Sequence, residues 1–240
     1  MRKFLYIFIY MLYFRLAMVA AQDLPAWFLN TPESPDILYA VGYARAYERV
    51  DSAIAMAVRD ADYQINLALR TKIYGERLFQ TLPGGRIIYQ GEIFREEPLI
   101  SMTPVYLDTI QTNGMILVLA ASRHPAQSVA LHLRTPYRKT PQWVTELPTN
   151  PAYMYALGVA PGYYYAEHSW LEAERQARQE LAYSFQTRQR QLMRSTPTSE
   201  YGVTASATAV QLHGIQVVAR WQSKTTYFVL AKSQATWPAE

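Results

Sequence analysis

The chain has 240 residues, of which 50% are hydrophobic and 18% charged, so it is too apolar for a disordered protein and long enough to bury a core. It contains no cysteine, which excludes disulfide scaffolds, thiolate zinc sites, cysteine nucleophiles and lipid attachment through an N-terminal cysteine. The formal net charge is +4, but the first 21 residues hold three basic residues and no acid, which leaves 20 basic and 19 acidic residues. That balance gives no general affinity for phosphate backbones, so we expect no nucleic-acid partner.

Residues 1–21 have the three-part pattern of a signal peptide. Two basic residues precede an unbroken apolar run over residues 4–14, and a site of small residues ends at Ala21. The run is shorter than the roughly 20 residues that span a bilayer. We therefore expect export and cleavage near Ala21. Two alternatives stay open: an uncleaved anchor, because the charge of Arg15 is unusual in a signal peptide, and a translation start at Met11.

The body of the chain contains a repeat. Residues 25–73 and 141–189 align without a gap, with 13 identities in 49 positions. The identities form one pattern: P-x-W, P-x-x-P, Y-A-[VL]-G-x-A and A-x-R-x-A. Such internal similarity indicates a duplicated structural unit. It predicts two domains, repeat 1 at residues 24–137 and repeat 2 at residues 138–240, joined by a proline-flanked polar linker.

In repeat 1 the apolar run 37–44 predicts a buried strand, in which Gly42 suits a bulge or a close backbone approach. A helix follows, with Asp51 or Ser52 as its N-cap and alanines at spacings of three and four along one face. Antiparallel strands are then expected at residues 86–94, 104–111 and 115–121, with 127–134 as an additional candidate. Asn113-Gly114 predicts a hairpin turn between two of them.

Repeat 2 follows the same order. Gly158 takes the place of the strand glycine, and the second helix is expected to start near Glu167 or His168. The faces of this helix away from its alanines are polar and include Glu174 and Arg178. Strands are predicted at residues 204–212, 215–221 and 225–232. The fold class is therefore α+β, as two tandem copies of a module in which one strand, a long helix and an antiparallel meander pack as a two-layer sandwich.

The signal segment, P-x-W, Y-A-x-G-x-A, the alanine-faced helix and a closing V-L-A strand together resemble the LPP-twenty lipoprotein-like family. The resemblance covers residues 25–121 and again residues 141–232. It implies, as relatives, surface lipoproteins and flagellar outer-membrane accessory proteins of Gram-negative bacteria. Members are typically lipid-anchored through a cysteine after the signal, which this chain lacks, and the tandem duplication is a second departure. The shared motifs determine fold, so the resemblance implies no catalytic residue.

Aromatic and basic side chains in repeat 2 are the candidate partner-binding groups. These residues are Tyr163, Tyr164, Tyr165, Trp170, Arg188 and Arg190. The three tyrosines precede the second helix and cannot all face inward. With the tryptophan they predict an exposed aromatic patch for a protein or glycan contact, the alternative being packing against the neighbouring domain. The two arginines end the helix, where they complement its dipole or contact acidic headgroups or glycan.

The sequence offers no constellation for catalysis or for binding a metal. No two of the four histidines lie within four residues of each other, there is no G-x-S-x-G elbow, and Gly84-Gly85 lacks the Lys-Ser/Thr that a phosphate loop needs. Glu96-Glu97 is expected to be a solvated strand end. We therefore expect no enzyme activity, no cofactor and no metal.

Two functions fit these features. The first is a non-enzymatic cell-envelope protein, an exported assembly module that binds itself or a protein partner in the periplasm or at the outer-membrane periphery, with outer-membrane and flagellum-associated complexes among the expected settings. The alternative is a periplasmic binding module that holds a peptide, a glycan or a small ligand in the cleft between its domains. A concave, aromatic-lined pocket between the domains is the feature that favours the alternative.

Overall fold

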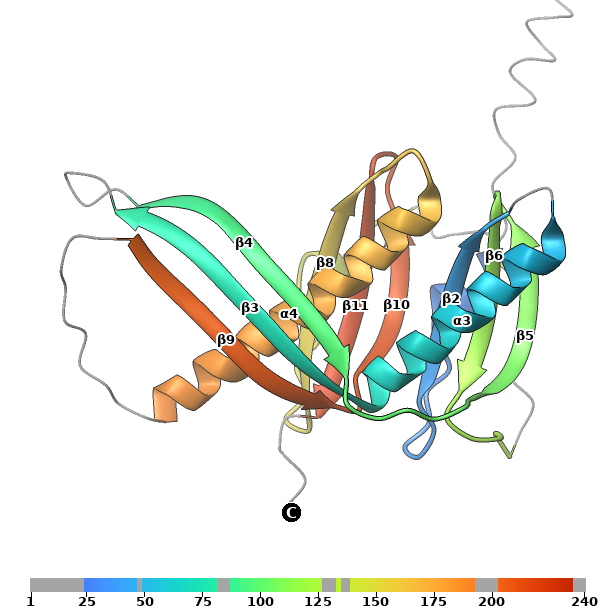
Figure 1. Ribbon diagram of the computed structural model, residues 1–240, viewed down its shortest axis with the longest axis horizontal. Helices are drawn as coiled ribbons and strands as arrows, with labels where there is room; N and C mark the ends of the chain where they lie inside the picture. Colours follow the sequence, from blue (N-terminus) through green and yellow to red (C-terminus); the bar gives the residue numbers. More distant parts are fainter. Residues whose placement is uncertain are drawn as a thin grey trace, which may run out of the picture.

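The protein has an α+β fold of helices and antiparallel sheets, drawn in Figure 1 from a computed structural model. The structure describes residues 24–46, 49–81, 87–126, 133–134, 139–192 and 203–234. We call residues 24–134 the first half and residues 139–234 the second half. The predicted signal segment lies outside the described residues, and none of the helices within them has the length and apolar character that a membrane span requires.

The first half contains a three-stranded sheet in the order β2-β6-β5. Its strands are β2 (Tyr39–Arg45), β5 (Val105–Thr112) and β6 (Met115–Ala121). Asn113 and Gly114 join β5 to β6 with φ angles of 54° and 74°. Positive φ at both central residues is typical of a type I′ turn, which the Asn-Gly dipeptide adopts readily. The predicted hairpin is therefore confirmed. The long helix α3 (Val50–Leu69) packs on one face of this sheet.

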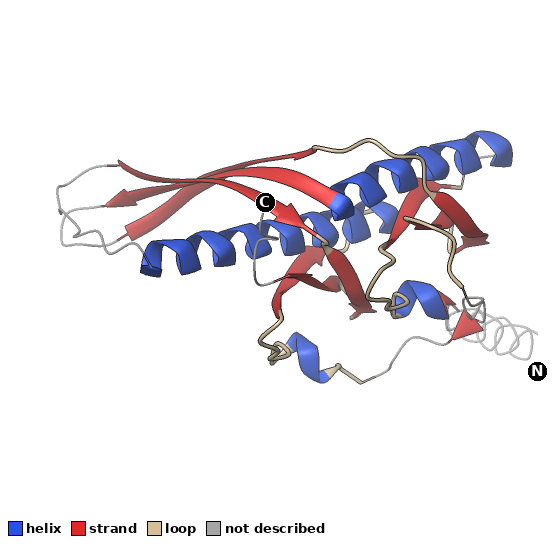
Figure 2. Ribbon diagram, turned by 90° about the horizontal axis from the view of Figure 1, so that it is seen from below, coloured by secondary structure: helices blue, strands red, loops and turns tan. Residues whose placement is uncertain are grey.

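The second half has the same arrangement. Strands β8 (Tyr153–Pro161), β10 (Gln216–Gln222) and β11 (Thr226–Gln234) form a sheet in the order β8-β11-β10, and helix α4 (Ala166–Leu192) packs on it. In each of these two sheets the strand that comes first in the chain, β2 or β8, pairs with the strand that comes last, β6 or β11. Figures 1 and 2 show α3 and α4 running in the same direction along the molecule. That the halves arose by duplication stays a prediction.

A glycine sets the distance between strand and helix in each half. A Cβ atom on Gly42 would lie 2.1 Å from the carbonyl oxygen of Ala57, and one on Gly158 would lie 1.8 Å from that of Ala173. Both alanines are fully buried. The strands keep an unbroken register through both glycines. Of the two roles expected for these glycines, the close backbone approach is therefore confirmed and the bulge is not.

A third sheet joins the halves. Its order is β4-β3-β9, with β3 (Arg70–Thr81) and β4 (Ile87–Pro98) from the first half and β9 (Val203–His213) from the second. Strand β3, which starts directly after α3, is absent from the predicted elements, and it pairs antiparallel with β9 along nearly its whole length. Figure 1 shows this sheet reaching past the other two beside α4. The two halves therefore share backbone hydrogen bonds and are not self-contained sandwiches.

The start of the described chain packs between the halves. After β1 (Leu24–Pro25), which pairs with β7 (Leu133–Arg134), comes the short helix α2 (Ala26–Leu29). The ring of Phe28 is fully buried and packs edge-on, at centroid distances of 6.0 Å and 5.2 Å, against Tyr43 of β2 and Trp170 of α4. Figure 2 shows α2 and the 3₁₀ helix η1 (Gln142–Val144) on the side of the sheets away from α3 and α4. This segment thus completes a core common to both halves.

The helix starts differ slightly from the predicted ones. Helix α3 begins at Val50 with Arg49 in the N-cap position and no side-chain capping bond. The predicted caps Asp51 and Ser52 were wrong, because both lie inside the first turn. Helix α4 begins at Ala166, one residue before the expected start.

Candidate functional site

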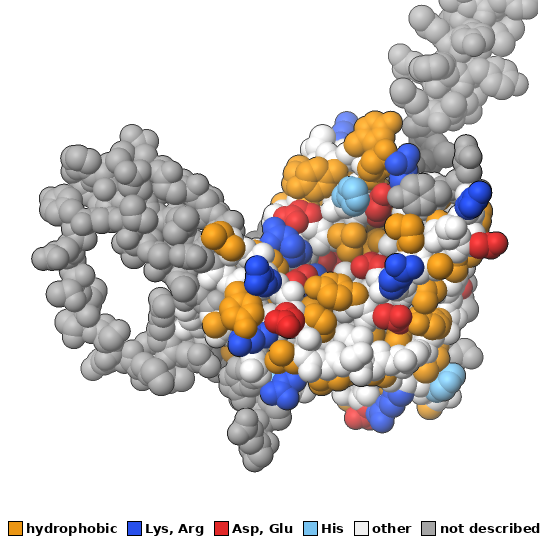
Figure 3. All heavy atoms as spheres, viewed as in Figure 1, with side chains coloured by type: hydrophobic (Ala, Val, Ile, Leu, Met, Phe, Trp, Pro, Cys, Tyr) orange, Lys and Arg blue, Asp and Glu red, His pale blue; other side chains and the backbone are white. Residues whose placement is uncertain are grey.

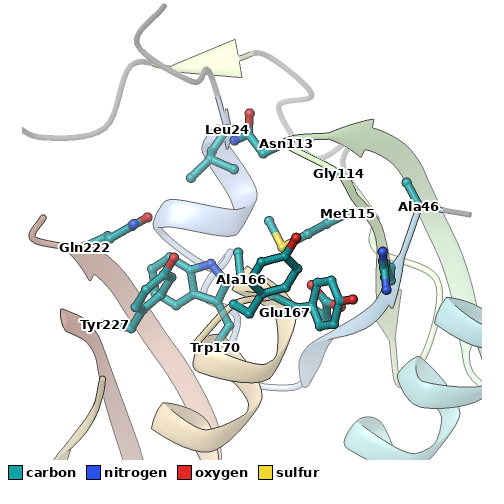
Figure 4. A pocket seen from close by; sticks show the side chains of 13 residues that line it. Leu24, Ala46, Asn113, Gly114, Met115, Ala166, Glu167, Trp170, Gln222 and Tyr227 are labelled. Carbon is teal, nitrogen blue, oxygen red and sulfur yellow. The ribbon is translucent and has the colours of Figure 1, made fainter. Parts of the chain in front are cut away.

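A pocket of about 430 Å³ opens between the two halves. The first half contributes the end of β2, the β5–β6 turn and Leu24, and the second half contributes the first turn of α4 and the ends of β10 and β11. Figure 4 shows Ala46 at one end of the pocket, with Trp170 and Tyr227 toward the other. The pocket therefore depends on both halves for its walls.

Trp170 forms part of the inner wall. Its ring packs between Phe28 and Tyr227, with a centroid distance of 4.7 Å and an interplanar angle of 82° to the latter. The residue is 1% exposed. The prediction that Trp170 belongs to an exposed patch was wrong, because Phe28 from the start of the chain covers its ring. Trp170 instead packs against Phe28 of the other half, which was the alternative prediction.

The tyrosines before α4 are partly exposed, as predicted. Tyr163 is 48% exposed and Tyr164 is 92% exposed, whereas Tyr165 is half-buried. The backbone N–H of Tyr163 donates to the hydroxyl of Ser169, which holds the loop against the helix. Tyr164 and Tyr165 line the pocket, and the guanidinium carbon of Arg45 lies 3.8 Å from the ring centroid of Tyr165. Two of the three tyrosines thus belong to the pocket.

Glu167 brings a carboxylate to the pocket wall. The residue is 5% exposed, and within the described part of the chain no hydrogen bond or ion pair reaches its side chain. It lies in the first turn of α4, where the helix dipole favours a negative charge. Burial raises the pKa of the neighbouring Tyr227. A hydrogen bond with Ser169 lowers this pKa, and the negative charge of Glu167 raises it. The pocket therefore contains an acidic group beside aromatic rings.

A buried ion pair within the second half forms hydrogen bonds with segments of the first half. The guanidinium of Arg220 in β10 donates to the carboxylate of Glu174 in α4 at 2.7 Å, and the side chains are 1% and 3% exposed. The hydroxyl of Tyr43 donates to the same carboxylate oxygen, and Arg220 also donates to the carbonyl of Phe28. Burial raises the pKa of Tyr43 well above its usual value. Four elements, β2, α2, α4 and β10, thus meet at one charge pair.

A second ion pair joins α4 to the first half. Arg178 donates from Nε and Nη2 to the two carboxylate oxygens of Glu96 at 2.7 Å and 2.8 Å, and from Nη1 to Gln64 of α3. The expectation that Glu96 lies at a solvated strand end was wrong, because its carboxylate pairs with Arg178 from a distant segment. Planar bidentate pairs hold their partners in a defined orientation. The two pairs therefore fix the walls of the pocket relative to each other.

Asp60 of α3 lies at the edge of this network and accepts hydrogen bonds from the backbone of Tyr43 and from Gln64. Burial raises its pKa from 3.8 to about 6. Since the folded state then binds the proton more tightly than the unfolded state, stability falls as the pH rises from about 4 through about 6. We expect Asp60→Asn to remove this loss, which amounts to about 3 kcal/mol. Urea unfolding between pH 4 and pH 7 measures it.

The control for Asp60→Asn is Asp51→Asn, an exposed aspartate in the first turn of the same helix. This variant should keep the pH dependence of the wild-type protein. If the free energy of unfolding falls with pH as steeply in Asp60→Asn as in the wild-type protein, the loss of stability does not come from Asp60.

The remaining candidates contribute less. Arg188 and Arg190 lie in α4, but their side chains are outside the described residues. His124 and His168 are exposed, as expected for surface histidines. Among the described residues no group of three metal-ligating side chains comes together. On the face drawn in Figure 3, basic and acidic side chains are interspersed, in line with the near-balanced charge of the sequence.

No protein-family model, curated protein or solved structure matches the chain. The resemblance to the LPP-twenty lipoprotein-like family therefore stays a prediction from the sequence motifs.

Proposed function

We propose that this chain is an exported, non-enzymatic binding protein of the cell envelope that holds its ligand in the pocket between the halves. The observation that carries the proposal is the pocket itself, about 430 Å³ in volume, with walls from both halves and aromatic side chains from the second. Ligand sites are commonly clefts of a few hundred Å³, lined by aromatic side chains and a few polar groups. A concave pocket lined by aromatic side chains is the feature that favours ligand binding over assembly, and this pocket has it.

The buried ion pairs support the proposal through preorganisation. Arg220–Glu174 and Arg178–Glu96 hold α4 against segments of both halves, so the pocket walls need little ordering when a ligand binds. Binding loses less free energy when the site is already formed. Placement in the periplasm or at the outer-membrane periphery rests on the predicted signal segment and is part of the proposal.

A pocket-filling variant tests the proposal. Gln222 is exposed at the end of β10 and lines the pocket, so Gln222→Trp should fill it without disturbing the core. In a thermal-shift screen of amines, sugars and short peptides, we expect at least one compound to raise the Tm of the mature protein and to lose this effect in Gln222→Trp. Gln234→Trp, an exposed glutamine outside the pocket wall, is the matched control. A screen with no hit, or hits that Gln222→Trp retains, would refute the proposal.

Assembly through strand addition is the second candidate function. Strands β5 and β8 lie at the outer edges of their three-stranded sheets. An open strand edge offers backbone donors and acceptors to a strand of another copy or of a protein partner. Light scattering of the mature protein separates the candidates, because self-assembly gives a mass that rises with concentration, whereas ligand binding by a monomer does not.

A further inference from the structure

The carboxylate of Glu167 is the least satisfied charged group in the pocket. The residue is 5% exposed and lines the pocket, and its side chain has no hydrogen bond or ion pair with any described residue. Its carboxylate oxygens are not among the sealed side-chain atoms that lack a hydrogen-bond partner, so they are open to the pocket, and the helix dipole favours their negative charge. A ligand that offers positive charge and hydrogen-bond donors would supply the missing partner.

The aromatic walls favour the same kind of ligand. Tyr164, which is 92% exposed, and the half-buried Tyr165 line the pocket, and aromatic faces attract cations through their quadrupoles. The pocket already contains one such contact, in which Arg45 lies over Tyr165. Arg45 is the last residue of β2 and covers the ring of Tyr165, so the exposed ring of Tyr164 is the aromatic face open to a ligand.

From these contacts we infer that the pocket takes an organic cation, with the ammonium group of the ligand beside the carboxylate of Glu167 and its alkyl groups against the tyrosines that line the pocket. The inference rests on the proposed function and specifies the chemistry of its ligand. An anionic ligand would be repelled by Glu167. A neutral sugar can stack on the exposed tyrosine and donate to the carboxylate, but it brings no positive charge to Glu167, so it is the alternative that the experiment tests.

Calorimetric titration with matched probes tests this inference on the mature protein at constant ionic strength. Choline and 3,3-dimethyl-1-butanol have the same shape and differ in the charge of one atom, nitrogen in the first and carbon in the second. We expect choline to bind at least about tenfold more tightly than the alcohol, because charge pairing and cation–π attraction act on choline alone. Glu167→Gln should remove most of this preference, by weakening choline binding about tenfold while changing binding of the alcohol less than about threefold.

The matched control is Glu172→Gln, which changes a carboxylate on the same helix that pairs with Arg175 outside the pocket. It should keep the preference for choline. The wild-type comparison of the two probes stands even if Glu167→Gln does not fold. Equal binding of the two probes, binding of glucose or N-acetylglucosamine without binding of choline, or an unchanged preference in Glu167→Gln overturns the inference and leaves the proposed function intact. Failure of every cation, alcohol and sugar probe to bind refutes both.

Discussion

Replacing Gly158 with alanine is expected to remove much of the folding stability of this protein. The added Cβ would lie 1.8 Å from the carbonyl oxygen of Ala173 and 2.6 Å from the backbone nitrogen of Ala177. Both contacts are backbone atoms of α4, so no side-chain rotation relieves them. The helix must move away from the sheet, which opens a gap around two alanines that are fully buried. We expect a loss of about 3 kcal/mol or more in the free energy of unfolding, measured by urea titration.

Gly162→Ala is the matched control for this prediction. A Cβ on Gly162 would lie 3.3 Å from its nearest neighbour, the carbonyl oxygen of Thr225, and the change should cost less than about 1 kcal/mol. Gly42→Ala, the equivalent change in the first half, would place its Cβ 2.1 Å from the carbonyl oxygen of Ala57 and should be as damaging as Gly158→Ala. Unfolding of Gly158→Ala at the urea concentration of the control would show that the close approach does not limit stability.

The strand–glycine–helix units could be predicted from the sequence because their signals are local. Gly42 and Gly158 stand in apolar strands, and the alanines they meet recur along one face of the following helix. The Asn113-Gly114 turn was predictable for the same reason, since both residues tolerate a positive φ. Period, turn chemistry and small residues are sufficient where the partner lies within a few tens of residues.

Strand β3 was missed because only half of its pairing is local. Residues 70–81 follow the helix without a break and pair on one side with β4, the next strand in the chain, and on the other side with β9, from residues 203–213. Trp170 was misplaced for a related reason, since its cover, Phe28, comes from the first half. No periodicity in a single segment reports a partner more than a hundred residues away.

The ion pairs behind the pocket show the same limit in the electrostatics. On α4 the sequence places Glu174 and Arg178 among polar residues, a pattern typical of a solvated face. The structure brings Arg220 and Glu96 to them, and the two carboxylate–guanidinium pairs become part of the interior. Buried and exposed ion pairs have the same composition, so only the partner's position distinguishes them.

Removing the carboxylate of Glu174 is the second change expected to have a large effect. In Glu174→Ala the guanidinium of Arg220, whose side chain is 1% exposed, loses its ion pair with Glu174, and the hydroxyl of Tyr43 loses its acceptor. An unpaired buried charge costs far more than a lost surface contact. We expect the free energy of unfolding to fall by about 3–5 kcal/mol. Glu172→Ala, which breaks the partly exposed pair with Arg175, should cost less than about 1 kcal/mol.

The double variant Glu174→Met/Arg220→Met separates the cost of the unpaired charge from the value of the pair itself. With both charges gone, most of the loss in Glu174→Ala should be recovered, because replacing a buried ion pair with apolar side chains of similar volume is often neutral. Recovery should stop short of the wild-type value, since the carbonyl of Phe28 and the hydroxyl of Thr31 also lose a donor when Arg220 is replaced. A Glu174→Ala protein as stable as Glu172→Ala would contradict the buried pair. A double variant less stable than Glu174→Ala would instead mean that Arg220 stabilises the contact between the halves mainly through its bonds to these two residues.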